Sequence, residues 1–170
     1  MNSHRARAAR FVTIAIFGCA ALAIVAAPLA RLRGHTTAAA AVYALFSTIC
    51  HQKPERSFSW HSEPFAVCQR CTGIYFGLFV AALVARGALE SSGVTARRAW
   101  IAAATLPMLV DVGLGIASVW TGNAVSRAAT GFLFGSMLAT ILIPAVAEFA
   151  AELPHGAARR GAALGEAGHE

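Results

Sequence analysis

Long apolar stretches are the feature that most constrains how this chain can fold. The first, Phe11–Ala30, holds 20 residues without a charged side chain, and an α-helix needs about 20 such residues to cross a bilayer. Apolar stretches with one charged residue each recur at Thr72–Leu89, Ala99–Trp120 and Ala128–Ala150, and a shorter one without a charge lies at Thr36–Ile49. The sequence therefore predicts an all-α fold: a polytopic membrane helix bundle with four or five membrane segments.

The composition supports a location in a lipid bilayer. Hydrophobic residues make up 57% of the chain and charged residues only 13%, against about 25% charged residues in soluble domains. Few soluble domains of this length could bury so much apolar surface. The formal net charge is +6, but the arginines cluster at the ends of apolar stretches, where they set membrane topology. We therefore expect the bilayer as a partner and no nucleic acid.

We divide the chain into three parts. Residues 1–10 form a basic N-terminal tail, residues 11–150 form the membrane helix bundle, and residues 151–170, rich in Ala, Gly and Arg, form a disordered tail. The basic start and the first apolar stretch also resemble a signal peptide. That stretch is longer than the usual apolar core of about 7–15 residues, and Pro28 would follow the cleavage site. We therefore expect a retained helix.

The positions of Lys and Arg near helix ends predict orientation. If Thr36–Ile49 crosses the bilayer, both sides hold equal numbers of basic residues; if it dips without crossing, the N-terminus joins the more basic side. Three basic residues, Lys53, Arg56 and Arg70, lie in the segment 50–71 and are candidates for function. Discounting them places this segment on the outer face of a multi-pass protein of the cell membrane in either case.

Residues 50–71 form a polar segment that we call the Cys/His-rich loop. It contains three of the four cysteines and two of the six histidines, and its two prolines disfavour a continuous helix. Cys68 and Cys71 can chelate one ion, at about 2.3 Å each for zinc, and Cys50 lies at a spacing found between ligand pairs of zinc sites. The predicted metal ligands are Cys50, His51, Cys68 and Cys71, with His61 as an additional candidate.

Other chemistry fits the same cysteines. On an outer face, Cys68 and Cys71 could form the redox pair of a membrane thiol oxidoreductase, with Cys50 as a resolving thiol, or the thiols could simply be packed. Thr72 stands where a haem-attachment motif has His, so no haem is expected. The expected cofactor is zinc, or copper if the thiols are reduced and exposed. Whether the protein is an enzyme stays open, and a homo-oligomer is compatible with the sequence.

Polar residues in and near the helices form a second candidate site. Asp111 is the 13th residue of a 22-residue apolar stretch, near the expected bilayer centre, where a carboxylate costs about 2.5–3.5 kcal/mol. Its candidate partners are Arg70 and Arg127, in a structural ion pair or an ion or proton relay. Guanidinium groups also suit a phosphate or lipid head group, so a lipid-head-group binder or enzyme is a further alternative. The residues of this site are Arg56, Ser57, Arg70, Asp111, Asn123 and Arg127.

Two short segments share a pattern of small residues. Thr72–Gly77 and Thr130–Gly135 each contain Thr-Gly, aromatic residues, and a second Gly four residues after the first. Small residues at this spacing let helices approach closely in lipid. We therefore expect two similar helix starts packed against each other through Gly73, Gly77, Gly131 and Gly135.

Together these motifs resemble a known family. The first block consists of Cys50-His51-Gln52, Pro54, Arg56-Ser57-Phe58 and Cys68-x-Arg70-Cys71-Thr72-Gly73-Ile74-Tyr75-x-Gly77. The second consists of Pro107-Met108, Asp111, Asn123, Arg127, Thr130-Gly131 and Gly135, with Val112 where the pattern often has Gly. Across roughly residues 45–140 the chain looks like the domain of unknown function 2085 family of small prokaryotic integral membrane proteins. The resemblance implies a membrane protein and implies no activity.

Overall fold

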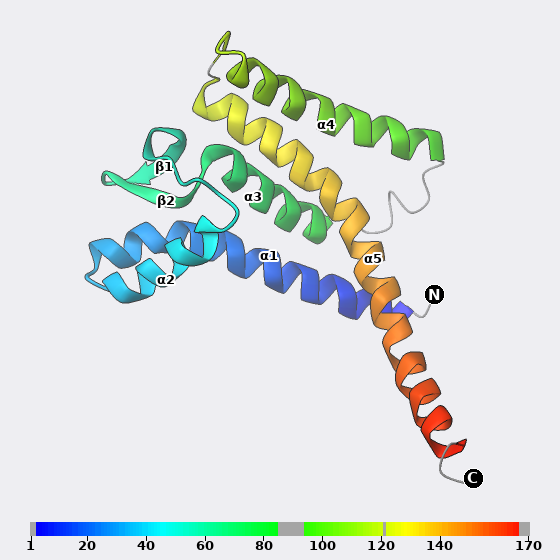
Figure 1. The fold of residues 1–170 in the computed structure, drawn as a ribbon. Coiled ribbons are helices and arrows are strands. Elements are labelled where there is room, and N and C mark those ends of the chain that lie inside the picture. Colours follow the sequence, from blue (N-terminus) through cyan, green and yellow to red (C-terminus); the bar gives the residue numbers. More distant parts are fainter. Residues whose placement is uncertain (1–2, 85–93, 121, 167–170) are drawn as a thin grey trace.

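The computed structural model describes residues 3–84, 94–120 and 122–166. The order of its elements is α1 (Ser3–Leu32), α2 (Thr36–Ser47), the 3₁₀ turn η1 (Pro54–Arg56), β1 (Ser57–Trp60), β2 (Glu63–Cys68), α3 (Gln69–Val84), α4 (Val94–Ile116) and α5 (Ala124–Glu166). Figure 1 shows α1, α3, α4 and α5 as long rods, with α2 and the two strands gathered at one end. The predominantly helical architecture predicted from the sequence is confirmed.

Within the described ranges, three helices are long and apolar enough to cross a membrane. They are Arg10–Leu32, Arg98–Ile116 and Ala124–Val146. The other two apolar helices, α2 with 12 residues and α3 with 16 residues, are shorter. Length and composition therefore support three membrane segments and do not confirm the predicted four or five. The predicted end of the segment Thr72–Leu89 lies outside the described residues.

The fold is not all-α, because part of the Cys/His-rich loop forms a β-hairpin. β1 pairs antiparallel with β2, and Trp60 lies opposite Glu63. The two residues between them, His61 and Ser62, have φ values of 47° and 69°, as a two-residue type I′ turn requires. The aromatic side chains of Phe58 and Trp60 alternate with serines, a pattern that favours a strand. Sequence reasoning missed the hairpin because such turns usually carry Asn-Gly or Asp-Gly.

The direction of the helices follows from contacts at the two ends of α1. Near its start, Arg10 donates hydrogen bonds to the carbonyls of Ala82 and Leu83 at the end of α3. Near its other end, Arg31 forms a 3.2 Å ion pair with Glu63 of the hairpin. α1 and α3 therefore run antiparallel, and we call the end of the bundle that carries the hairpin the mouth (Figure 1).

α2 begins and ends at the mouth. It starts four residues after α1 ends, and just beyond its last turn the sulfur of Cys50 accepts a hydrogen bond from the backbone N–H of Cys68 at 3.2 Å. The 12 residues of α2 are fewer than the roughly 20 that a full span needs, and whether the segment Thr36–Ile49 dips or crosses stays a prediction.

A small apolar core lies under the Cys/His-rich loop. Its buried members come from α1, α2, β2 and the loop itself, and they are Ile24, Ala27, Phe46, Cys50, Ala66 and Val67. The rings of Phe46 and Tyr75 meet edge to face, with centroids 5.5 Å apart. The loop is thus held by packing against helices as well as by its own hairpin.

α3 and α5 lie parallel with their backbones in direct contact. A Cβ atom added to any of four glycines would lie 2.1–2.2 Å from a carbonyl oxygen of the other helix, closer than real Cβ atoms approach. These glycines are Gly73, Gly77, Gly131 and Gly135. Gly73 faces the carbonyl of Ala128, and Gly131 faces that of Arg70, so the two helices contribute equivalent positions to the contact.

α5 continues through Glu166 and therefore covers most of the range 151–170, for which the sequence predicts a disordered tail. Alanine, glutamate and arginine are good helix formers, and they are frequent in this part of the chain. Their helix propensity is the physical reason for the difference between the expected tail and the helix.

We expect Gly77→Ala to lower the free energy of unfolding by about 1–3 kcal/mol, because its methyl group would overlap the backbone of α5. Gly113→Ala is the matched control, since a Cβ there meets nothing within 4 Å. The measurement is the thermal unfolding midpoint of each variant in detergent. Equal midpoints for the two variants would contradict the close contact between α3 and α5.

Candidate metal centre

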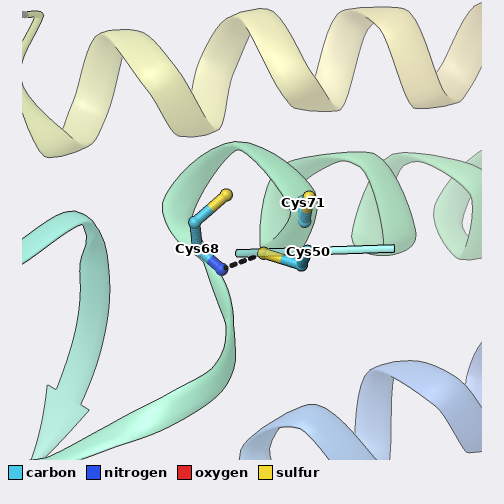
Figure 2. Close-up of side chains that lie close together, drawn as sticks. All are labelled: Cys50, Cys68 and Cys71. Carbon is cyan, nitrogen blue, oxygen red and sulfur yellow. Dashed lines mark hydrogen bonds between the residues drawn. The ribbon is translucent and has the colours of Figure 1, made fainter. Parts of the chain in front are cut away.

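Three cysteine side chains meet at the mouth. Cys50 follows α2, Cys68 is the last residue of β2, and Cys71 lies in the first turn of α3 (Figure 2). Their sulfur atoms all lie within 4.8 Å of one another. Thiolates about 2.3 Å from a tetrahedral zinc ion lie about 3.8 Å apart, so the cluster is within about 1 Å of the spacing that a shared ion requires. These three residues could hold a metal ion.

Backbone N–H groups point at two of the sulfurs. The N–H of Cys68 donates to the Cys50 sulfur at 3.2 Å, as drawn in Figure 2. The N–H groups of Arg70 and Cys71 donate to the Cys68 sulfur, because Cys68 stands directly before the first turn of α3. Hydrogen bonds from a helix N-terminus stabilise a thiolate. The local fold therefore prepares the sulfurs to carry negative charge.

The thiols of Cys68 and Cys71 form a hydrogen bond with each other. The hydrogen bond from the Cys71 thiol is the main reason why the pKa of Cys68 falls from its ordinary value of 9.0 to about 5, although burial opposes the shift. A metal ion needs all of its thiol ligands deprotonated, so its binding would release protons from this pair.

The two histidines of the loop lie outside the cluster. Among the described residues, the group of mutually close ligand atoms contains the three sulfurs and neither histidine. His51 lines a cavity beside the sulfurs. His61 occupies the exposed hairpin turn, where its ring centroid is 6.0 Å from that of Trp60. Of the ligands predicted from the sequence, the structure brings together Cys50, Cys68 and Cys71.

Gln52 positions the segment that carries Cys50. Its side-chain amide donates hydrogen bonds to the carbonyl of Tyr43 in α2, at 2.7 Å, and to the carbonyl of Ala66 in β2, at 2.8 Å. Its backbone has a φ of 49°. Sequence reasoning gave this residue no role, and its position directly after Cys50-His51 was the one available signal.

A second glutamine connects the hairpin to α5. The buried side chain of Gln69 donates to the carbonyl of Ser57 at 3.4 Å and accepts from the guanidinium of Arg127 at 3.2 Å. The hydroxyl of Ser57 donates to the carbonyl of Lys53 at 3.0 Å. Ser57 and Arg127, both predicted as members of a polar site, thus take part in holding the hairpin in place. Gln69 was missed by sequence reasoning.

A cavity of about 310 Å³ opens beside the sulfurs. Its walls include the backbone that follows α2, the three cysteines and the start of α3. The cationic residues that line it are Lys53, Arg56, Arg70 and Arg127. The sequence placed the three arginines in a polar site, and it named Lys53 as a candidate for function without assigning it to that site.

Asp111 lies closer to the mouth than predicted. α4 ends at Ile116, so Asp111 stands five residues from the end of the helix, while the sequence placed it near the middle of a longer stretch. Ser118, with a φ of 58°, lies just beyond the end of α4. The Arg70 guanidinium donates to Asp111 Oδ2 from Nε at 2.9 Å and also from Nη2. This ion pair joins α3 to α4.

Asn123 caps α5. Its side-chain oxygen accepts a hydrogen bond from the N–H of Ser126 at 2.8 Å, and the Ser126 hydroxyl oxygen accepts one from the N–H of Asn123 at 3.1 Å. This reciprocal pair is a capping box with serine in the third position. The exposed Asn123 therefore has a structural role at the helix start.

The long apolar helices and the cysteine cluster at their mouth define a helical membrane protein with a candidate metal centre. The chain matches the family described as "Predicted membrane protein (DUF2085)" over residues 50–141. This range includes the Cys/His-rich loop, α3, α4 and the start of α5, and the chain belongs to this family.

Two uncharacterised archaeal proteins are similar to the chain. One, from Methanocaldococcus jannaschii, is 32% identical over 104 residues, which are 61% of this chain and 67% of the relative. The other, from Methanothermobacter thermautotrophicus, is 62% identical over 34 residues, which are 20% of this chain and 31% of the relative. The match thus spans less than a third of the second protein. No solved structure matches the chain.

We expect Asp111→Asn to lower the free energy of unfolding by about 2–4 kcal/mol, because it removes the charge partner of Arg70. The pair is mostly buried, with the Arg70 side chain 23% exposed and that of Asp111 7% exposed. The control is Glu63→Gln, which breaks a pair exposed at 47% and 30% and should cost about 0–1 kcal/mol. Unfolding monitored in detergent gives both values. Equal losses would argue against a structural role of the Arg70–Asp111 pair.

We also expect the Cys68 thiol to react with iodoacetamide well below neutral pH in metal-free protein. Its pKa is lowered to about 5, so the thiolate persists above that pH and its alkylation rate should fall as the pH drops through about 5. Peptide mass spectrometry after timed labelling at pH 4–9 gives the midpoint. Cys71→Ala should raise this midpoint more than Cys50→Ala, since Cys71 makes the larger contribution. A midpoint near 9 in the unaltered protein would contradict the thiol contact.

Proposed function

We propose that this integral membrane protein binds one zinc or copper ion at its mouth through Cys50, Cys68 and Cys71. The observation that carries the proposal is the convergence of three sulfurs within 4.8 Å. The backbone N–H groups directed at Cys50 and Cys68 support it further, because such hydrogen bonds stabilise metal-bound thiolates.

Three protein ligands favour ion handling over purely structural support. Structural zinc sites have four protein ligands, whereas sites with three keep a position open for another ligand. The Cys/His-rich loop is also held by contacts that need no ion, namely the Gln52 hydrogen bonds and the packing of Val67 in the core. The open position would face the cavity, where His51 or a small ligand could occupy it.

Two properties of the membrane arrangement belong to the same proposal. α3 is the fourth membrane segment, since it starts at the mouth beside α5 and its end meets the start of α1. The mouth faces outward in the cell membrane, as the distribution of Lys and Arg near the helix ends favours. Under this arrangement the cysteine cluster meets ions that arrive from outside.

A thiol oxidoreductase is the second candidate, and it rests on the proximity of Cys68 and Cys71. Oxidation would join the two sulfurs in a disulfide, and an oxidised partner disulfide would accept the two electrons and two protons. Thiol trapping in membranes would detect a reversible Cys68–Cys71 disulfide if this candidate is right.

Elemental analysis of protein purified in detergent tests the metal proposal. We expect about one zinc or copper ion per chain, and a loss of most of it in Cys50→Ser, Cys68→Ser and Cys71→Ser. Cys19→Ser is the matched control because Cys19 lies in α1, outside the cluster, and it should keep full metal content, as should His61→Ala. The proposal would be refuted if wild-type protein bound no metal after zinc or copper was added. It would also be refuted if the Cys71→Ser variant kept its full metal content.

A further inference from the structure

We propose that the cavity at the mouth binds a phosphate group or an oxyanion of similar size. Four cationic side chains line it, from η1, α3, α5 and the residue before η1: Lys53, Arg56, Arg70 and Arg127. No aspartate or glutamate is among its lining residues. Such a concentration of one sign of charge in a concave site attracts and holds ions of the opposite sign.

The negative charge near the cavity does not balance these cations. Asp111 already binds Arg70 and is outside the lining. Among the described residues, neither Lys53 nor Arg56 forms an ion pair. A zinc ion with three thiolates would add one net negative charge, which leaves the cavity positive. An anion is therefore the complementary ligand.

Two of the cations are held in place before any ligand arrives. Arg70 is fixed by Asp111 through two guanidinium nitrogens. Arg127, which is 9% exposed, is bound to the side-chain oxygen of Gln69. A guanidinium presents several donors in a planar fork that matches the oxygens of a phosphate group. Preorganised donors reduce the entropy that binding costs.

The other two cations lie at the entrance. Lys53 and Arg56 are exposed, and the 3₁₀ turn η1 begins directly after Lys53 and ends at Arg56. Because both side chains are exposed, they can contact a ligand that enters from the mouth. Two hydrogen-bonded cations inside and two exposed ones at the entrance are an arrangement suited to reversible binding.

The volume limits the size of the ligand. About 310 Å³ is at the lower end of the range of roughly 300–1,000 Å³ for small-molecule sites. A phosphate group fits, whether free in solution or as the head group of a lipid whose chains stay in the bilayer. Both sources share the same recognition chemistry, and this inference does not require the metal ion, since the four cations are not its ligands.

The test uses the full chain reconstituted in phosphatidylcholine nanodiscs at low salt, titrated with inorganic phosphate by isothermal titration calorimetry. We expect saturable binding that the Lys53→Gln/Arg56→Gln double variant weakens at least tenfold. Arg33→Gln is the matched control because Arg33 is an exposed arginine near the mouth, just after α1, that does not line the cavity; it should change affinity by less than twofold. Arg56→Lys keeps the charge and should weaken binding less than Arg56→Gln.

A second arm separates the two sources. Nanodiscs that contain phosphatidic acid are analysed by native mass spectrometry for lipid retained on the protein. Retained phosphatidic acid without binding of free phosphate identifies a head-group site, and the reverse identifies a soluble anion; either result supports the inference. No saturable binding in both arms, or equal weakening by Arg56→Gln and Arg33→Gln, overturns it.

The metal content of the same samples keeps the two proposals apart. The Lys53→Gln/Arg56→Gln double variant should lose phosphate binding and keep its metal. Cys71→Ser should lose metal. If the wild-type protein binds phosphate but no metal, the anion site stands and the metal proposal fails. If it binds metal but no phosphate, the metal proposal stands and the anion site fails.

Discussion

The contact between the backbones of α3 and α5 is the constraint on which the rest of the structure depends. In lipid the hydrophobic effect does not drive helices together, so the free energy of association has to come from close packing. Glycines at equivalent positions of both helices allow carbonyl oxygens of one to lie where a side chain of the other would stand. The same contact brings the start of α3, with Arg70 and Cys71, next to Arg127 at the start of α5. A thiol cluster and a cationic cavity arise where these two helices begin.

The Cys/His-rich loop solves a second problem, which is how an irregular segment satisfies its polar groups at a membrane boundary. The hairpin pairs part of the backbone, and two glutamines bond to carbonyls of α2 and the hairpin strands. Sulfur atoms accept several of the remaining N–H groups. Because buried polar groups are costly when unpaired, these side chains make the loop a defined structure, and the cysteines serve both as hydrogen-bond acceptors and as candidate ligands.

Features that depend on local composition could be predicted from the sequence. Apolar stretches gave the helices, and the pattern around Gly73 and Gly131 pointed to the helix pair. The hairpin could not be predicted, since His61-Ser62 is an uncommon turn pair. Asp111 stands nearer a helix end than the sequence suggested, because the apolar stretch continues past the end of α4. Gln52 and Gln69 act through contacts with distant backbone carbonyls, and no spacing rule reveals such contacts.

The antiparallel path of α1 and α3 has a further consequence. α1 starts at the end of the bundle away from the cysteines, and α5 begins at the mouth and runs toward that same end. The helices α1, α3, α4 and α5 thus alternate in direction along the bundle (Figure 1). Under the proposed four-span arrangement, reporter domains fused before α1 and after α5 would share one compartment, and a protease supplied to the opposite compartment would reach the mouth but neither reporter.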